Sequence, residues 1–132
     1  MWHRKQVDAF AAQGPGQIVV ARDVSATGHK EYGCLTRNAL NSLGPGFVNE
    51  VIRTTSVCFL YFDLEHPRTP NDVSDADICT ELVVGVRALL ADLYGVETAE
   101  PLIADSSTDT KFSRHVIFDC QFRNNWKHMR TF

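Results

Sequence analysis

Two carboxylates at the downstream end of an apolar segment are the residues of this sequence best suited to chemistry. Five of the six residues from Phe59 to Leu64 are apolar or aromatic, as expected of a buried strand, and the acids are Asp63 and Glu65. Side chains two apart in a strand point to the same face, so these acids lie side by side. A cation stabilises adjacent negative charges, and oxygen ligands favour Mg²⁺ or Mn²⁺ over zinc. The alternative is a pair of ordinary surface acids, because D-x-E is a common triplet.

A second set of polar side chains alternates along a later segment. Lys111, Ser113 and His115 share one face of the strand expected there. Three donors within about 13 Å of one another suit a triphosphate. Beside a metal held by the two acids, they would form a nucleotidyl-transfer site, in which metal ions bridge phosphates and activate a 3′-hydroxyl. Local hydrogen bonding by His115 and solvation of Lys111 would explain the same pattern without a function.

A serine–histidine hydrolase is a poor explanation of this second set. Ser113 and His115 are two residues apart on a strand, so their side chains lie roughly 7 Å from each other. That separation is too great for a nucleophile and its general base.

Length and composition describe an ordinary globular protein. The 132 residues suffice for one domain, with 44% hydrophobic and 22% charged residues. The formal net charge of -3 restricts nucleic-acid contact to a local patch. The four cysteines are scattered without disulfide or zinc spacing, which favours a reducing compartment. No apolar run approaches the roughly 20 residues of a membrane span, so no membrane partner is expected, and the N-terminus lacks the apolar region of a secretory signal.

The elements that position these residues are predicted to form an α+β fold with a mostly antiparallel sheet and packed helices. Hydrophobic periodicity, β-branched runs and turn residues divide the chain. Upstream we expect a helix over Arg4–Gln13, a hairpin of strands Gln17–Arg22 and His29–Leu35, a helix over Thr36–Leu43, irregular structure over Phe47–Arg53 and the strand Ser56–Leu64. Downstream we expect a loop from His66 to Asp72, a helix over Ser74–Tyr94, a strand over Pro101–Ala104, a polar turn over Asp105–Thr110 and the strand Lys111–Phe118.

The long helix is predicted to be core scaffolding. Ser74 followed by Asp77 resembles a capping box, and Gly95 is suited to end the helix. Apolar residues recur at intervals of three and four, namely Ile78, Leu82, Val86, Leu89, Leu90 and Leu93. We therefore expect this stripe to pack against the sheet.

Two segments together resemble a known family. Residues 60–65, LYFDLE, resemble the D-x-E motif of the eukaryotic primase-polymerase (PrimPol) family of the archaeo-eukaryotic primase superfamily. Residues 105–118, DSSTDTKFSRHVIF, resemble its S-x-H motif and are the more specific match. The resemblance also runs through residues 93–96 and, more loosely, residues 4–10. It implies a fold like part of the RRM-like primase core, in an intracellular protein of the nucleus and mitochondrion.

The resemblance also implies an activity, namely DNA-directed priming and damage-tolerant synthesis on a single-stranded DNA template. Asp63 and Glu65 would be the catalytic ligands of Mn²⁺ or Mg²⁺. The second motif would hold the triphosphate of a dNTP or NTP through Lys111, Ser113 and His115. A basic residue of the early hairpin would join them, with Lys30 preferred to Arg22.

The sequence departs from the family pattern after these motifs. The family has a third catalytic carboxylate and a zinc-binding domain in later motifs, and these lie beyond Phe132. We therefore expect residues 1–132 to form a single domain, the N-terminal part of a catalytic core without a zinc site. It would be a fragment of a longer protein, or a second chain would complete its active site.

Two other functions remain open at this point. One is a non-catalytic module that binds a nucleotide, DNA or a protein partner with the same surface. The other is a metal-dependent nuclease that uses Asp63 and Glu65, which would cleave DNA without any need for nucleotides.

Overall fold

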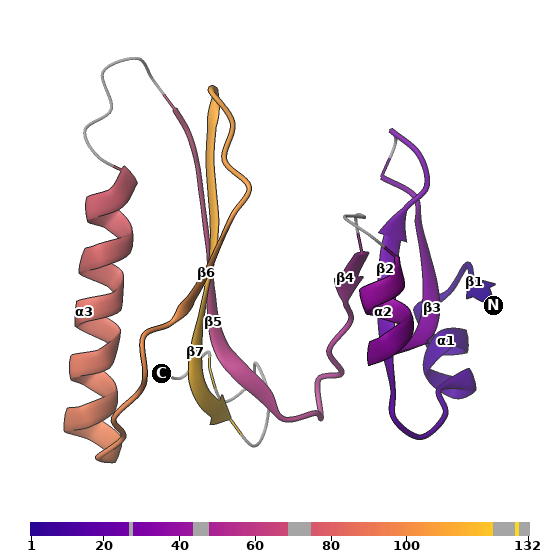
Figure 1. Ribbon diagram of the computed structural model, residues 1–132, viewed down its shortest axis with the longest axis horizontal. Helices are drawn as coiled ribbons and strands as arrows, with labels where there is room; N and C mark the ends of the chain where they lie inside the picture. Colours follow the sequence, from indigo (N-terminus) through magenta and orange to yellow (C-terminus); the bar gives the residue numbers. More distant parts are fainter. Residues whose placement is uncertain (27, 44–47, 69–74, 123–128, 130–132) are drawn as a thin grey trace. The chain divides into compact units, whose positions relative to one another are not determined.

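The chain folds into two compact units, Met1–Arg53 and Thr54–Phe132 (Figure 1). The structure is a computed structural model that describes residues 1–26, 28–43, 48–68, 75–122 and 129. Each unit has its own antiparallel sheet together with helices, which confirms the predicted α+β class. That residues 1–132 form a single domain, and that the fold resembles the primase core, stay predictions.

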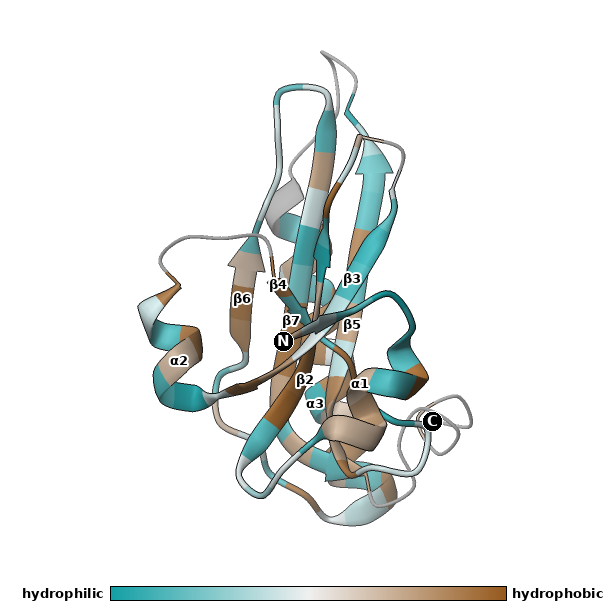
Figure 2. Cartoon of the chain, turned by 90° about the vertical axis from the view of Figure 1, so that its right-hand side faces the viewer, coloured by the Kyte–Doolittle hydropathy of each residue, from teal (hydrophilic) through white to brown (hydrophobic). Residues whose placement is uncertain are grey.

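The first unit contains a four-stranded sheet in the order β1-β3-β2-β4. Its elements are β1 (Trp2–His3), α1 (Gln6–Ala12), β2 (Gln17–Asp23), β3 (Lys30–Thr36), α2 (Arg37–Ser42) and β4 (Val48–Glu50). The predicted hairpin is confirmed, since β2 and β3 pair along all seven residues of each strand. Hydrophobic residues run along β2 (Figure 2), and Val19, Val20 and Ala21 are buried there.

The sequence predicted irregular structure over Phe47–Arg53, and this prediction was wrong because strand β4 forms within that segment. Residues Val48–Glu50 pair with β2, with Val20 opposite Glu50 and Arg22 opposite Val48. Three residues are too few to show an alternating pattern. The strand exists because β2 offers it a backbone edge from far away in the sequence.

The second unit contains a three-stranded sheet in the order β5-β7-β6, with one long helix beside it (Figure 1). Its elements are β5 (Cys58–Pro67), α3 (Asp75–Tyr94), β6 (Leu102–Asp105) and β7 (Lys111–Phe122). The core between helix and sheet consists of Leu60, Cys79, Val86, Leu90, Phe112, Val116, Phe118 and Phe122. Helix α3 therefore covers one face of this sheet and leaves the side chains of the other face outside this core.

Strand β5 is longer than the sequence pattern predicted. We expected a loop from His66, but His66 and Pro67 pair with Phe112 and Lys111 of β7. A proline is tolerated at the end of a strand. Because β5 continues past both acids, Asp63 and Glu65 lie within a paired strand and not at its frayed end.

Helix α3 ends as predicted but buries a different stripe. Gly95 has a φ of 63°, and its N–H donates to the Ala91 carbonyl at 2.9 Å, which closes the helix. Ser74 of the predicted capping box lies outside the described residues. Leu82, Val86 and Leu90 pack on the sheet as expected, whereas Ile78, Leu89 and Leu93 are exposed and Cys79 is buried instead. A sheet of three strands covers only a narrow strip of a helix.

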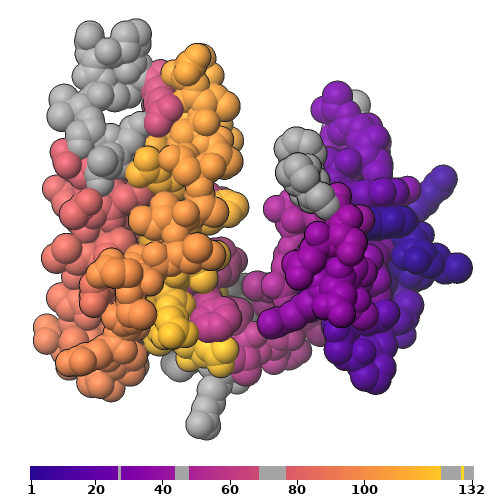
Figure 3. All heavy atoms as spheres, in the orientation of Figure 1, coloured from indigo at the N-terminus to yellow at the C-terminus, as the bar shows by residue number. Residues whose placement is uncertain are grey.

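An open pocket lies on the α3 side of the sheet. Helix α3 and the β6 segment lie side by side in the space-filling view (Figure 3), and the pocket between them is lined by Cys79, Thr80, Val83, Val84, Arg87, Glu100, Pro101 and Ile103. Ile103 pairs with buried Val116. Val116 is next to His115 in β7, so the two side chains point to opposite faces of the sheet. The pocket is therefore on the opposite face of the sheet from the polar residues singled out above.

Candidate functional site

Five of the six predicted site residues meet on one face of the second unit's sheet. The antiparallel register of β5 and β7 places Asp63 opposite His115 and Glu65 opposite Ser113, with Lys111 two pairs further along. Alternation puts these residues on the face away from α3. The predicted face of β7 and the predicted carboxylate pair of β5 thus form one surface, although about 50 residues separate them in sequence.

The two acids already contact basic side chains of the neighbouring strand. Lys111 Nζ lies 2.8 Å from Glu65 Oε2, and His115 Nε2 lies 3.2 Å from Asp63 Oδ1. The four side chains are between 46% and 55% exposed, so each pair contributes only about 0–1 kcal/mol and is readily exchanged for a ligand. The positive charge that the two carboxylates require is therefore supplied, at least in part, by β7.

Ser113 differs from its neighbours because it is buried. Its residue is 7% exposed beneath the turn that joins β6 to β7. Ser106 Oγ donates to Ser113 Oγ at 3.0 Å, and the Ser113 N–H donates to Ser107 Oγ at 3.0 Å. The two serines of the turn therefore fix the position of Ser113. Sequence reasoning missed these two hydroxyls, although the run Asp105-Ser106-Ser107 just before the strand was a visible signal of a hydrogen-bonded turn.

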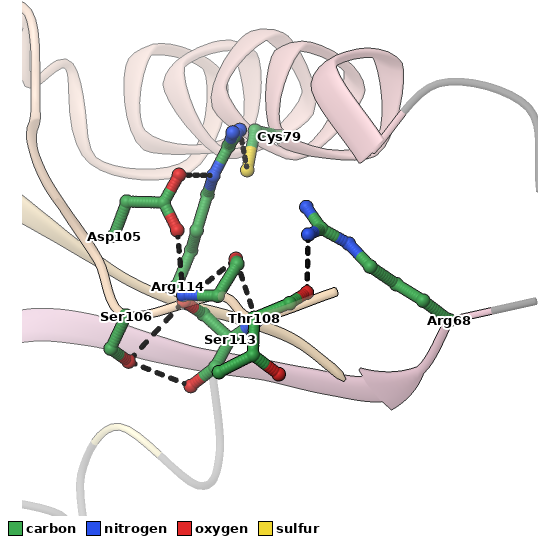
Figure 4. Close-up of polar contacts among 8 residues, drawn as sticks. Arg68, Cys79, Asp105, Ser106, Thr108, Ser113 and Arg114 are labelled. Carbon is green, nitrogen blue, oxygen red and sulfur yellow. Dashed lines mark hydrogen bonds and ion pairs between the residues drawn. The ribbon is translucent and has the colours of Figure 1, made fainter. Parts of the chain in front are cut away.

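A hydrogen-bond network on the α3 side of the sheet holds that turn against the helix (Figure 4). Arg114 Nε donates to Asp105 Oδ2 at 2.9 Å, and Arg114 Nη1 donates to Cys79 Sγ of α3 at 3.5 Å. Asp105 Oδ1 in turn accepts from the Ser107 N–H at 2.9 Å. One arginine thus connects the helix, the turn and β7 directly beside Ser113.

The charges of this network are stabilised in their ionised forms. Hydrogen bonds from Ser107, and then the Arg114 guanidinium, lower the pKa of Asp105 to about 2. The pKa of Arg114 is raised, chiefly by its hydrogen bond to Cys79, while desolvation opposes the rise and Asp105 reinforces it. Both groups are charged over the whole physiological range of pH.

A second arginine fixes the other side of the turn. The Arg68 N–H donates to the Thr110 carbonyl at 2.9 Å, and Arg68 Nη1 donates to the Thr108 carbonyl at 2.6 Å (Figure 4). The turn is therefore attached to the end of β5 as well as to α3. Lys111 begins its strand from a segment held at both sides.

The sixth predicted residue, Lys30, belongs to the first unit. It begins β3, and its Nζ lies 3.8 Å from Asp23 Oδ1. Arg22, the weaker candidate, pairs with Glu31 at 2.9 Å and lies over the Trp2 ring at 4.0 Å. The assignment of Lys30 to the nucleotide site stays a prediction, as do the roles of the other five residues.

Among residues 1–26, 28–43, 48–68, 75–122 and 129, no group of three or more His, Cys, Asp or Glu residues is placed to hold a metal ion. Asp63 and Glu65 thus form a pair of carboxylates without a third such ligand placed beside them among the described residues. No helix among those residues is both long and apolar enough to cross a membrane.

Part of this chain is similar in sequence to curated proteins that share one name. None of the protein-family models matches the sequence. The chain is 45% identical to the "DNA-directed primase/polymerase protein" of Homo sapiens over 82 residues, which cover 58% of this chain and 15% of that protein. It is 44% identical to the protein of that name in Gallus gallus over 72 residues, which cover 52% of this chain and 12% of the relative.

A third relative agrees with these two. The Mus musculus protein of the same name is 39% identical over 89 residues, which cover 63% of this chain and 16% of the relative. These matches confirm the resemblance to a primase-polymerase for somewhat more than half of the chain. The chain spans about a sixth or less of the length of the curated relatives it matches.

Proposed function

From this similarity to DNA-directed primase/polymerase proteins, we propose that the exposed face of β5 and β7 is the metal- and triphosphate-binding part of a nucleotidyl-transfer site. The observation that carries the proposal is the register of the two strands. It sets Asp63 opposite His115 and Glu65 opposite Ser113 on one face of the sheet, so the acids of β5 lie beside the hydrogen-bond donors of β7.

Asp63 and Glu65 are the proposed ligands of a divalent cation. Both are half-exposed carboxylates on one strand face, and Mg²⁺ is usually held by one or two carboxylates together with substrate phosphates. The donor set is all oxygen, which fits Mg²⁺ or Mn²⁺ and does not fit zinc. When bound, such a cation neutralises phosphate charge and lowers the pKa of an attacking hydroxyl.

Lys111, Ser113 and His115 are the proposed contacts of the triphosphate of a dNTP or NTP. In the free chain Lys111 and His115 are engaged by the two acids. With Asp63 and Glu65 engaged as ligands, Lys111 and His115 would be available to contact phosphate oxygens. Ser113 is held in place by Ser106 and Ser107, so it donates from a position prepared before the ligand arrives.

The wider reaction includes groups outside this face. We propose that Lys30 adds a further phosphate contact, and that a single-stranded DNA template aligns the incoming nucleotide for priming and for synthesis past damage. Two carboxylates provide fewer oxygen donors than the family pattern, so we propose that a third is supplied by another chain or segment. The compartment proposed from the resemblance is the nucleus and mitochondrion.

A non-catalytic nucleotide-binding module is the second candidate. It is favoured by the finding that no described residues form a group of three or more potential metal ligands. Such a module binds a metal–nucleotide complex through the same face but joins no nucleotides.

The deciding experiment is a de novo priming and primer-extension assay on single-stranded DNA with dNTPs and Mn²⁺. The wild-type chain is compared with Asp63→Asn, His115→Ala and the matched control Glu100→Gln, whose acid is paired with Arg87 on the α3 side of the sheet. The same samples are checked for folding by circular dichroism and for Mn²⁺-dependent dNTP binding. Synthesis lost in the first two variants and kept in the control supports the polymerase.

Two other outcomes have distinct meanings. Mn²⁺-dependent dNTP binding without DNA synthesis supports the proposed binding face, and it is the result expected both of the non-catalytic module and of a site whose third carboxylate comes from another chain or segment. Binding that survives in both Asp63→Asn and His115→Ala removes the proposed site from consideration and returns the acids to ordinary surface residues.

A further inference from the structure

An exposed apolar row adjoins the charged face. Tyr61 of β5 lies opposite Ile117 of β7, and Ile117 lies opposite Leu102 of β6. Tyr61 is 46% and Leu102 67% exposed, and Ile117 is half-buried between them. We call these three residues the apolar row. Because neighbouring strands are about 4.8 Å apart, the row is about 10 Å wide.

The next row along the same face contains the site itself. It consists of Asp63, His115 and Ala104, which are again opposite one another across the three strands. Two residues of a strand separate the rows, a distance of about 7 Å. Ala104 is the smallest of the three side chains, so the surface beside His115 is low and continuous with the apolar row.

The rows are therefore ordered along the strands. Lys111 lies at one end, Ser113 and Glu65 follow, Asp63 and His115 come next, and Tyr61 begins the apolar row at the other end. A nucleoside triphosphate has the same order of chemistry, because its γ- and β-phosphates are followed by the α-phosphate and then by sugar and base. Nucleotidyl transfer occurs at the α-phosphate, so that group must lie beside the metal ligands.

We infer that the apolar row is the contact surface for the sugar and base of the incoming nucleotide, with the Tyr61 ring as its main element. This inference rests on the proposed function. The γ-phosphate then lies at Lys111 and the α-phosphate at Asp63, and the nucleoside extends over Tyr61, Ile117 and Leu102. The opposite orientation would place the apolar base at Lys111 and the charged triphosphate on Tyr61.

The exposure of these side chains supports a ligand on this face. Single exposed apolar residues are ordinary, but an aromatic and two aliphatic residues in one row form a patch of the kind that marks binding sites. Aromatic side chains on an open sheet face are a common platform for bases. The row is continuous with the charged face, which selects a phosphorylated ligand over a protein or lipid.

The test separates the nucleoside from the phosphates. The full 132-residue chain is titrated in the presence of Mn²⁺ with dATP and, separately, with inorganic tripolyphosphate. Variants are Tyr61→Ala, Tyr61→Phe and Lys111→Ala, with Leu93→Ala as the matched control, because Leu93 is an exposed apolar residue of α3 in the same unit. The quantity compared is the ratio of the two dissociation constants.

The expected result is specific to the ring. Tyr61→Ala weakens dATP binding by about 5- to 150-fold, the range for loss of a base–aromatic stack, and leaves tripolyphosphate binding unchanged. Tyr61→Phe retains most of the dATP affinity, and Leu93→Ala alters neither ligand. Lys111→Ala weakens both ligands to a similar extent.

Three outcomes overturn the inference. If Tyr61→Ala leaves dATP affinity unchanged, or weakens both ligands equally, the nucleoside does not lie on the apolar row, while a loss of both ligands in Lys111→Ala still supports the proposed function. If the folded wild-type chain binds neither ligand with Mn²⁺, the proposed function fails and this inference fails with it.

Discussion

The hairpin of the first unit and the β5–β7 pair of the second each contain two cross-strand ion pairs, but they arrange the charges differently. In the hairpin, Arg22 is opposite Glu31 and Asp23 is opposite Lys30. Each strand thus has one acid and one base. These are consecutive residues, so the two pairs lie on opposite faces of the sheet.

In the second unit both acids are on β5 and their basic partners are on β7. Asp63 and Glu65 are two residues apart and share a face, and Lys111 and His115 share the same face of β7. Two negative charges are therefore neighbours along β5, which is unfavourable before any ligand binds. A pattern with a standing cost of this kind is typical of a binding site, whereas the isolated pairs of the hairpin need no explanation beyond surface electrostatics.

The largest expected effect is the loss of Mn²⁺ affinity when both acids of β5, Asp63 and Glu65, are neutralised. Asp63→Asn combined with Glu65→Gln should lower Mn²⁺ affinity by about 100-fold or more, because even residues that only support a metal ligand contribute 10- to 100-fold. The fold should persist, since neutralisation also removes the repulsion between the two acids. Electron paramagnetic resonance titration of free Mn²⁺ measures the affinity.

The hairpin provides the matched control for this change. Asp23→Asn combined with Glu31→Gln removes the same total charge from acids that are also in ion pairs. An equal loss of Mn²⁺ affinity in both double variants would show that net charge, and not the arrangement of the acids, accounts for binding.

A smaller effect is expected from the turn that holds Ser113. Ser107→Ala removes the oxygen that accepts the Ser113 N–H at 3.0 Å, which costs about 1–3 kcal/mol for a buried donor left unpaired. Hydrogen exchange should therefore accelerate at the Ser113 amide. Ser25→Ala is the control, because Ser25 lies in the hairpin turn of the first unit, where its Oγ is 3.4 Å from Nδ1 of the exposed His29. This control should have little effect on hydrogen exchange at the Ser113 amide. Comparable exchange in wild type and Ser107→Ala would mean that the turn does not hold Ser113.

Local sequence patterns predicted which residues share a face but not which residues meet. The alternation of Lys111, Ser113 and His115, and the spacing of Asp63 and Glu65, indicated the correct faces of both strands. The pairing of Lys111 with Glu65 depends on the register between strands about 50 residues apart, which no local period contains. The same limit explains why β4 was missed, because its partner β2 lies far upstream.

Burial was predicted less well than periodicity. Leu89 and Leu93 fit the helical stripe but are exposed, since the narrow sheet covers only the strip around Val86 and Leu90. Ser113 was expected on the polar face and does lie there, yet it is buried by the turn above it. Which apolar positions a helix buries, and which polar positions a loop covers, depends on the width and reach of elements elsewhere in the chain.

The acid of the turn gives a prediction about pH. The pKa of Asp105 is lowered from 3.8 to about 2 in the folded chain, so its ionised form stabilises the native state. This contribution is present above about pH 4 and is lost as the pH falls through about 2. Asp105→Asn cannot titrate, so its urea midpoint should lie below that of wild type at about pH 5 and approach it at about pH 2. A gap that stays constant over this range would contradict the role assigned to Asp105.

The smallest expected effect has the opposite sign to the first and is the sharpest test of the comparison. In EDTA, where no divalent cation is free, Asp63→Asn should bind inorganic tripolyphosphate more tightly than wild type. The change releases His115 from a 3.2 Å contact with Asp63 and removes a negative charge that repels the ligand. An exposed ion pair contributes about 0.2–1 kcal/mol, so the gain should be about 1.4- to 5-fold. Isothermal titration calorimetry measures it, with Glu31→Gln as the control.

The two signs together distinguish a ligand site from a pair of surface ion pairs. If the carboxylates serve only to neutralise Lys111 and His115, Asp63→Asn changes neither metal binding nor metal-dependent nucleotide binding, and only the gain in EDTA is seen. If they hold the cation, the same substitution weakens nucleotide binding with Mn²⁺ and strengthens tripolyphosphate binding without it. Neutralising an acid of the hairpin should cause neither change in binding. Its two acids lie on opposite faces of the sheet, and so do its two basic residues, so they do not form a shared site.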